Sequence, residues 1–211
     1  YVPSAQRELV AAGAPGEHRH ATIAFVDVPG TDDLLASAGP AALTAVMQRV
    51  ADATDAATAA WGTQWLSTDL GPNSLKLMLT GGVPTSLGND EDRMLRTMCQ
   101  LQEECADIGL RIGVHRGRVY CGFVGATWRR GFTVVGDAVN LSARLMQHAG
   151  GGDLVASRVA LDWADSHFEE TPLAPFRVKN KTNPVEASVV HGVAGRKAKG
   201  EAHALPLVGR G

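Results

Sequence analysis

The sequence has few cysteines, no long apolar run and no marked excess of either charge. Its three cysteines, Cys99, Cys105 and Cys121, are odd in number and lack the spacing of metal ligands. We therefore expect packed thiols, not a disulfide framework or a zinc site. No apolar stretch approaches the roughly 20 residues of a membrane span, and no signal peptide is recognisable. These absences predict a cytoplasmic protein with no membrane partner.

Charge and aromatic content argue against a nucleic-acid-binding protein. Lys and Arg number 20 against 22 Asp and Glu, so the formal net charge is −2, and aromatic residues make up 5% of the chain. Proteins that bind nucleic acid usually carry a basic face with interleaved aromatic side chains. We therefore predict no nucleic-acid partner. The 211 residues are 45% hydrophobic, which suffices for one substantial core.

Hydrophobic periodicity and turn residues predict the order β, α, β, β, α, β in the first part of the chain. The expected elements are a strand at 21–28, a helix at 40–61, a hairpin of strands at 64–69 and 75–82, a helix at 89–105, and strands at 110–117 and 118–125. This order is typical of the ferredoxin-like α+β fold, an antiparallel sheet with helices packed on one face. Further along we expect a strand at 129–135, a helix after Gly136, a strand at 153–157, a helix at 157–167, and terminal strands at 176–180 and 185–192.

The periodicity and the turn residues also predict that the chain has three parts. Residues 1–20 are expected to form a short helix and a polar connector, and residues 21–192 a single domain. Residues 193–211 are basic, contain glycine and have no periodicity, so they resemble a linker to a downstream module.

The helix after Gly136 has one narrow polar stripe. At 100° per residue, Asp137, Asn140, Arg144, Gln147 and His148 fall within an arc of roughly 100°, and apolar residues fill most of the remainder. By itself, such a stripe is as consistent with an ordinary solvated face as with a binding site.

A carboxylate at the end of the first strand adds to this pattern. Asp27 follows an apolar run and precedes a Pro-Gly turn, where it can point into a cleft. A lone aspartate in this position is more often a turn residue. Together with the polar stripe, it favours a site for phosphoryl chemistry on a nucleotide, which needs carboxylates for Mg²⁺ and a cation near the phosphates.

Three segments of the sequence resemble the class III adenylyl/guanylyl cyclase family. They are "ATIAFVDVPGTD", "LRIGVHRGRVYCGFVGATWRRGFTVVGDAVNLSARLM" and "FRVKNKTNPVEASVV", and the resemblance extends from about residue 19 to residue 192. More narrowly, the chain looks like the second of two cyclase homology domains in bacterial proteins related to soluble adenylyl cyclase. There an ATPase module follows, and "LPLVGRG" resembles its beginning.

The resemblance implies roles for individual residues. Asn140 would orient the ribose for attack by its 3′ hydroxyl, and Arg144 would stabilise charge on the phosphates. Thr133 would read the adenine edge, and Asp137 would be a further nucleotide-binding residue. Asp27 matches the first of two metal-binding aspartates.

The hairpin departs from the family pattern. The second metal position falls on Asn73 or a loop neighbour, and Asp69 is the only nearby carboxylate. Lys76 is the only candidate for the base-contacting lysine, although a strand lysine is more often a solvated charge. A neutral amide binds Mg²⁺ less well than a carboxylate does. The two-ion Mg²⁺ or Mn²⁺ site that the family implies is therefore expected to be incomplete in this chain.

Two functions remain open at this point. The first is an adenylate cyclase-type lyase that converts ATP to 3′,5′-cyclic AMP and pyrophosphate. In it this chain would supply transition-state and base-reading residues to another cyclase homology domain, in a homodimer or an intramolecular pair. The alternative is a catalytically degenerate domain that dimerises or binds nucleotide to regulate signal transduction. In either case we expect the isolated chain to be weakly active or inactive, and the sequence does not decide between ATP and GTP.

Overall fold

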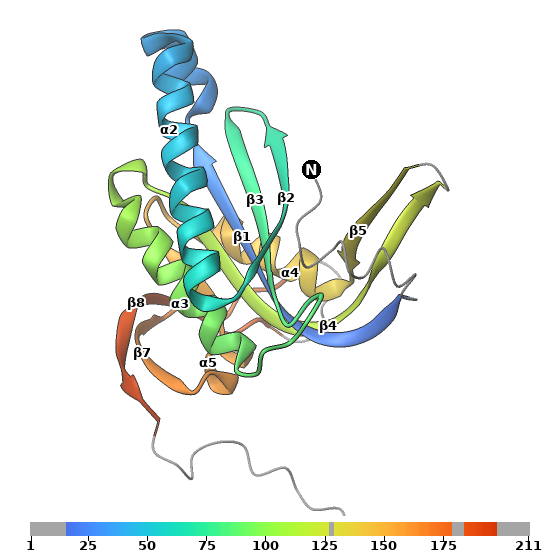
Figure 1. The fold of residues 1–211 in the computed structure, drawn as a ribbon. Coiled ribbons are helices and arrows are strands. Elements are labelled where there is room, and N and C mark those ends of the chain that lie inside the picture. The colour runs from blue at the N-terminus through green and yellow to red at the C-terminus, as the bar shows by residue number, and fades with distance from the viewer. Residues whose placement is uncertain (1–15, 127–128, 179–183, 198–211) are drawn as a thin grey trace, which may run out of the picture.

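The structure, a computed structural model, describes residues 16–126, 129–178 and 184–197. Its elements follow one another as β1 (Glu17–Pro29), α2 (Thr31–Trp61), β2 (Gln64–Gly71), β3 (Ser74–Gly81), α3 (Asp90–Glu104), the 3₁₀ turn η1 (Ala106–Ile108), β4 (Arg111–Ala126), β5 (Arg129–Val135), α4 (Asp137–His148), β6 (Leu154–Ser157), α5 (Arg158–Trp163), β7 (Ser166–Pro172) and β8 (Ala187–Arg196). Figure 1 shows these elements gathered around one twisted sheet, from which β4 and β5 project as an arm.

The first half of the chain forms the expected βαββαβ unit. The sheet order is β2-β3-β1-β4-β6-β8-β7, and β2, β3, β1 and β4 pair antiparallel with their neighbours. The helices α2 and α3 pack on one face of this unit, where Val26, Leu77 and Met94 belong to the largest buried cluster. This confirms the α+β class and the antiparallel pairing predicted for this part of the chain.

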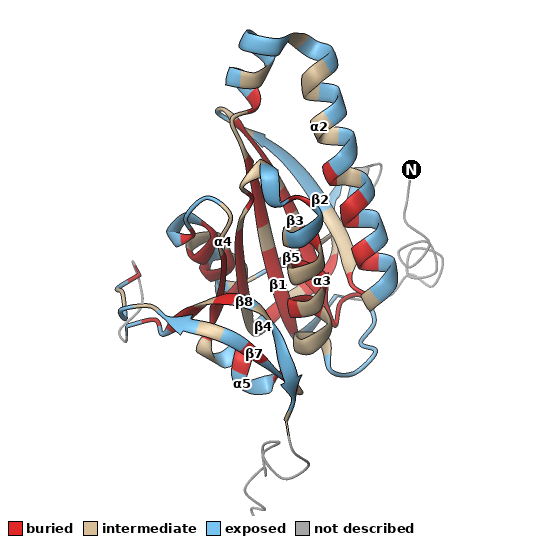
Figure 2. Cartoon of the chain, turned by 90° about the vertical axis from the view of Figure 1, so that its left-hand side faces the viewer, coloured by how far each residue is buried: buried red, intermediate tan, exposed pale blue. Residues whose placement is uncertain are grey.

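The second half adds a helix on the opposite face. In Figure 2 the sheet lies between α4 on one side and α2 and α3 on the other. Ala138 of α4 packs with Ile23 and Val119, and Leu145 packs with Val155, in clusters separate from the one under α2 and α3. Helices therefore cover both faces of the complete sheet. The two helices of the βαββαβ unit lie on one face, as expected, but the expectation of a single covered face is wrong, because α4 packs on the opposite face of β1 and β4.

Several boundaries differ from the sequence expectation. The two strands expected at 110–117 and 118–125 are one strand, β4, and the helix expected at 157–167 ends at Trp163. A strand that the sequence did not predict, β7, follows and pairs with β8. Strand β8 continues to Arg196, into the segment predicted as linker. The predicted N-terminal helix lies outside the described residues, as do residues 198–211. The polar connector predicted up to residue 20 is in part strand, because β1 begins at Glu17.

The polar stripe of α4 lies on the exposed side of the helix. Asp137, Asn140, Gln147 and His148 are exposed and Arg144 is half-buried. Leu141, Leu145 and Met146 are buried, because α4 lies directly on β4. At Gly113 of β4 an added Cβ would be 2.2 Å from the backbone nitrogen of Met146. The periodicity in the sequence therefore predicted the orientation of this helix.

The cysteines are packed thiols, as expected. All three are free, and Cys105 and Cys121 are buried. Burial raises the pKa of the Cys99 thiol to about 11, so that thiol stays protonated at neutral pH. Among the described residues, no helix combines the length and the apolar character that a membrane crossing requires.

Candidate functional site

Four charged residues form a row across the sheet. In the strand registers Asp69 faces Lys76, Lys76 faces Asp27, and Asp27 faces Arg111, so the row crosses β2, β3, β1 and β4 in that order. Residues directly opposite one another in a sheet point to the same face. The four side chains therefore project from one face with alternating charge.

Asp27 is the buried member of this row. Its side chain is 1% exposed, and its Oδ2 accepts hydrogen bonds from Arg111, from Nε at 2.9 Å and from Nη2. Among the described residues, its Oδ1 has no hydrogen-bond partner although it is buried. A buried carboxylate needs a compensating charge and hydrogen bonds, and here Arg111 supplies both to one oxygen.

A small cavity opens beside this carboxylate. It has a volume of about 310 Å³ and is lined by Asp27, Asn73, Lys76 and Arg111 together with Gln147 of α4 and several neighbours. The residues come from β1, the β2–β3 turn, β3, β4 and α4. The cavity therefore lies on the α4 side of the sheet, and the polar stripe of α4 begins at its edge.

The structure brings together only part of the predicted site. Asp27 and Lys76 line the cavity, while Asp69 faces Lys76 across the hairpin but is not among the lining residues. Asn140 and Arg144 lie further along α4. Asn140 is seven residues before Gln147, which is roughly 10 Å along a helix axis.

The other two predicted nucleotide-binding residues also lie away from the cavity. Thr133 is on β5, opposite Gly122, and Asp137 is the first residue of α4. Thr133, Asp137, Asn140 and Arg144 therefore all lie outside the lining of the Asp27 cavity, whereas Lys76 is part of it.

The donors around Asp27 do not fit a two-ion metal site. Mg²⁺ prefers an octahedron of oxygen ligands that usually includes one or two carboxylates. Among the residues that line the cavity, Asp27 is the single carboxylate, and one of its oxygens is bonded to Arg111; the other side-chain oxygens are the neutral ones of Asn73, Ser74 and Gln147. Within the described part of the chain, no group of three or more His, Cys, Asp or Glu residues is arranged to hold a metal ion.

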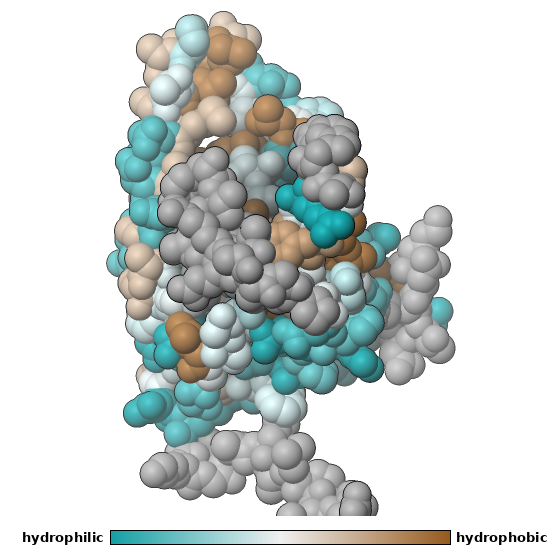
Figure 3. All heavy atoms as spheres, turned by 45° about the vertical axis from the view of Figure 1, so that its right-hand side comes forward, coloured by the Kyte–Doolittle hydropathy of each residue, from teal (hydrophilic) through white to brown (hydrophobic). Residues whose placement is uncertain are grey.

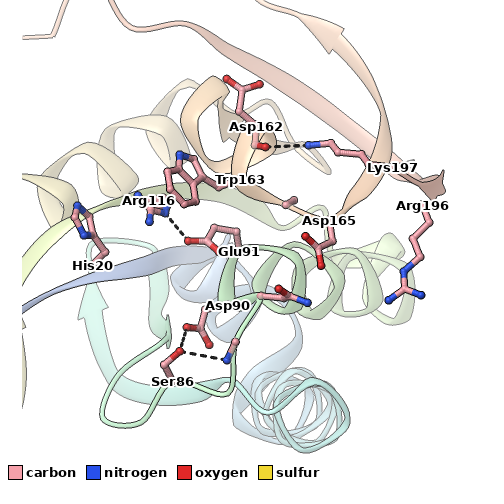
Figure 4. Close-up of a pocket in the computed structure, with 13 residues that line it drawn as sticks. His20, Ser86, Asp90, Glu91, Arg116, Asp162, Trp163, Asp165, Arg196 and Lys197 are labelled. Atoms are coloured by element: carbon pink, nitrogen blue, oxygen red, sulfur yellow. Dashed lines mark hydrogen bonds and ion pairs between the residues drawn. The ribbon is translucent and has the colours of Figure 1, made fainter. Parts of the chain in front are cut away.

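A larger cavity lies on the other face of the sheet. It measures about 760 Å³ and is lined by residues of α3, α5 and the ends of β1 and β8, among them His20, Glu91, Trp163 and Arg196 (Figure 4). None of the predicted site residues is among those that line it. Arg116 of β4 stands at its wall, stacked 3.9 Å from the centroid of the Trp163 ring and ion-paired with Glu91.

We expect this arginine to stabilise the fold. The side chains of Arg116 and Glu91 are 14% and 13% exposed, so Arg116→Met leaves a largely buried carboxylate without its partner. The expected loss is about 3 kcal/mol of unfolding free energy in urea. Arg49→Met is the control, because its ion pair with Asp107 is exposed to solvent and contributes little to stability. Equal losses in the two variants would contradict a stabilising role for the buried pair.

Sequence reasoning missed Arg111 and the cluster of Arg116, Glu91 and Trp163. Arg111 precedes an apolar run and has no pattern of its own in the sequence. Only the pairing of β1 with β4 places it opposite Asp27. Gln147 was assigned to the polar stripe, but its position beside the cavity depends on where the hairpin lies.

The comparisons with known proteins identify one family. Residues 92–192 match a family described as "Adenylate and Guanylate cyclase catalytic domain". Two relatives from Mycobacterium tuberculosis, the uncharacterized proteins Rv1318c and Rv1320c, are 33% and 32% identical over 168 and 151 residues. The aligned parts cover 76% and 69% of this chain but 30% and 25% of those relatives, so the chain spans less than a third of their length.

Solved structures share the fold at low sequence identity. The adenylyl cyclase CyaB from P. aeruginosa has a TM-score of 0.74 and 19% identity, covering 84% of this chain and 96% of that one. The guanylyl cyclase Cya2 has a TM-score of 0.72 and 22% identity, covering 85% and 95%. The names of these two proteins give different nucleotides, so the shared fold does not decide the substrate.

Proposed function

Because residues 92–192 belong to the adenylate and guanylate cyclase catalytic domain family, we propose that this chain is one half of a nucleotide cyclase that converts ATP to 3′,5′-cyclic AMP and pyrophosphate. The observation that carries the proposal is the exposed stripe of Asn140 and Arg144 on α4. Asn140 is exposed, and the half-buried Arg144 makes none of the ion pairs found among the described residues, so both side chains can contact a second domain.

Each residue of the stripe has a chemical task in this reaction. The 3′ oxygen attacks the α-phosphorus, the bond to the pyrophosphate oxygen breaks, and the 3′ proton leaves to solvent. The Asn140 amide can hold the ribose so that the 3′ oxygen faces phosphorus. The Arg144 guanidinium faces charge that grows on the phosphates, and Thr133 offers a hydroxyl that donates to and accepts from a base edge.

The second domain must supply what this chain lacks. A metal-assisted reaction needs carboxylates that this chain does not gather around Asp27. In our proposal the partner contributes those carboxylates, and this chain contributes Thr133, Asn140 and Arg144. The active unit is therefore a pair of cyclase homology domains, whether in one polypeptide or between two.

The test compares the full-length natural protein with the isolated chain. Each is supplied with ATP or GTP and Mg²⁺ or Mn²⁺, and the cyclic product is quantified by mass spectrometry. We expect linear formation of cyclic AMP by the full-length protein and little or none by the isolated chain. Cyclic GMP as the main product would overturn the substrate assignment, and no cyclic product from the full-length protein would overturn the function.

The alternative, a degenerate domain that only binds nucleotide or pairs, also has a supporting observation. Among the described residues that line the cavity, Asp27 is the one carboxylate, and it is bonded to Arg111 of the same chain. A domain with a regulatory role has no need of a complete metal site. Nucleotide binding without turnover in the full-length protein would favour this alternative.

Self-association follows from the same proposal. Leu70 at the hairpin and Val124 and Val135 on the β4–β5 arm are 74%, 51% and 56% exposed. Figure 3 shows apolar atoms at the surface on this side of the molecule, among hydrophilic ones. Apolar groups that are exposed in one domain can be buried when two domains pair. We expect sedimentation velocity to show a concentration-dependent dimer.

A pair of variants locates the interface. Val135→Asp on the arm is expected to shift the chain towards monomer, because it places a charge in an apolar contact. Val193→Asp on β8, which is 43% exposed and lies away from the arm, is expected to leave the dimer intact. A strict monomer in the unmodified chain at high concentration, or equal effects of both variants, would contradict the expected interface.

A further inference from the structure

Asn73 is fixed by five hydrogen bonds to the start of α2. Its Oδ1 accepts from the backbone nitrogens of Asp32 at 2.8 Å and Asp33 at 3.1 Å, and its Nδ2 donates to the Asp33 carboxylate at 2.7 Å. Its backbone nitrogen donates to the Asp32 carboxylate at 2.8 Å, and its carbonyl accepts from the backbone nitrogen of Gly30 at 2.9 Å.

These bonds have the chemistry of a helix cap supplied from another element. The residue at the N-cap of α2 is Gly30, which has no side chain to accept from the first backbone N–H groups. Asn73 provides that acceptor from the β2–β3 turn. An amide suits the position because it accepts two N–H groups through its oxygen and donates to Asp33 through its nitrogen. A carboxylate at 73 would face the carboxylates of Asp32 and Asp33.

The second observation concerns the charge on Asp27. The Arg111 guanidinium lies where a cation is needed beside this buried carboxylate, and it is held there by the pairing of β1 with β4. The cavity therefore already contains a fixed positive charge next to its only carboxylate, and Lys76 lines the same cavity. A divalent cation at this position would meet both charges.

From these contacts we propose that this end of the sheet is a structural clamp and not a metal site. Asn73 caps α2 from the hairpin, and Arg111 takes the place of a divalent cation beside Asp27. The proposal deepens the proposed function, because it means that only one composite site of a domain pair holds metal ions. That site is the one formed by the partner's carboxylates and this chain's Asn140 and Arg144.

Manganese binding to the isolated chain tests the proposal without turnover. Free Mn²⁺ is measured by electron paramagnetic resonance during titration with the protein, and the melting temperature is measured in EDTA and in excess Mn²⁺. We expect no stoichiometric binding and equal melting temperatures in both conditions. Stoichiometric binding of Mn²⁺ that Asp27→Asn abolishes would overturn the proposal.

A substitution at position 111 tests whether the arginine replaces a cation. Arg111→Gln leaves the Asp27 carboxylate without its counter-charge, so we expect a lower melting temperature that Mn²⁺ partly restores. Arg116→Gln is the matched control, because it removes an arginine from a carboxylate on the other face of the sheet, and its melting temperature should not respond to Mn²⁺. If Mn²⁺ leaves the melting temperature of Arg111→Gln unchanged, or changes it equally in both variants, the proposal that Arg111 takes the place of a metal ion is overturned. If Arg111→Gln does not fold, the titration of the unmodified chain decides.

Hydrogen exchange tests the clamp. Asn73 and Asn89 are the two non-glycine residues with positive φ among the described residues, at 50° and 52°, so alanine carries a similar backbone cost at either position. Only Asn73 uses its side chain as a cap, whereas Asn89 makes no side-chain cap bond to α3. We expect Asn73→Ala to reduce the protection of the Asp32 and Asp33 amides by about tenfold and Asn89→Ala to leave it unchanged. Unchanged protection in Asn73→Ala would overturn the clamp.

The two proposals fail in different experiments. If the full-length protein makes no cyclic nucleotide while the chain still binds no Mn²⁺, the proposed function fails and the clamp stands. If the full-length protein is active while this chain binds Mn²⁺ through Asp27, the proposed function stands. The proposal that Arg111 takes the place of a metal ion then fails.

Discussion

Replacing Arg144 with alanine in the full-length protein is expected to lower turnover by about 10²- to 10³-fold, equivalent to about 3–4 kcal/mol of transition-state stabilisation. The guanidinium is half-buried on α4 and makes none of the ion pairs found among the described residues, so it is available to phosphate charge. Charge on the phosphates grows in the transition state, and an interaction made chiefly there changes kcat more than KM. Steady-state kinetics with ATP separates the two parameters.

The control for this experiment is another surface arginine. Arg49 lies on α2, on the opposite face of the sheet, and pairs with Asp107. Arg49→Ala is expected to keep the parental kcat, and both variants are expected to keep the parental circular dichroism spectrum. Parental turnover in a folded Arg144→Ala protein would show that the stripe is an ordinary solvated face.

Replacing Gly113 with alanine is expected to destabilise the chain by about 3 kcal/mol, at the upper end of the usual cost of overpacking. An added Cβ at this position of β4 would lie 2.2 Å from the backbone nitrogen of Met146 and 2.4 Å from the backbone oxygen of Ser142. Both are backbone atoms of α4, so no rotation of a side chain relieves the contact and the helix must move away from the sheet. Urea unfolding measures the loss.

The same variant links packing to the site, because α4 carries Asn140 and Arg144. We expect Gly113→Ala to lower turnover in the full-length protein even below its unfolding temperature. Gly192→Ala in β8 is the control, since a Cβ there meets no atom within 4 Å. Similar stability of the two variants would mean that α4 does not rest on Gly113 as described.

Local sequence patterns predicted those elements whose signals are local. The helix α4 begins after Gly136 and buries the residues that its periodicity marks as apolar, such as Leu141 and Leu145. The strand β7 was missed because its residues, "SHFEETP", are short and polar. It forms because β8 offers it a partner. The sequence predicted two strands in place of β4 because Gly117 interrupts the run of strand-forming residues. In the structure Gly117 lies within β4 and close to α4, and a Cβ added to it would be 2.8 Å from the Ala138 Cβ.

The sequence predicted individual candidate residues of the site but not which of them lie next to one another in the fold. Asp27, Asn140 and Arg144 stand in recognisable motifs, and the roles of Asn140 and Arg144 remain predictions. Which charge faces Asp27 depends on strand pairing over 84 positions of sequence, which no local pattern encodes. Likewise, the capping by Asn73 depends on α2 beginning beside the hairpin. From the sequence alone, the neutral amide of Asn73 could be interpreted only as the absence of a metal-binding carboxylate.

The length of β4 has a mechanical consequence. The strand is 16 residues long and runs without interruption from Arg111, beside the Asp27 cavity, to Ala126 in the arm. At about 3.3 Å per residue its contour is roughly 50 Å, and no loop divides it. A partner that binds the arm therefore contacts the same strand that begins beside the Asp27 cavity. Because no loop interrupts β4, we expect a partner that binds the arm to alter the surroundings of Arg111 through the strand itself.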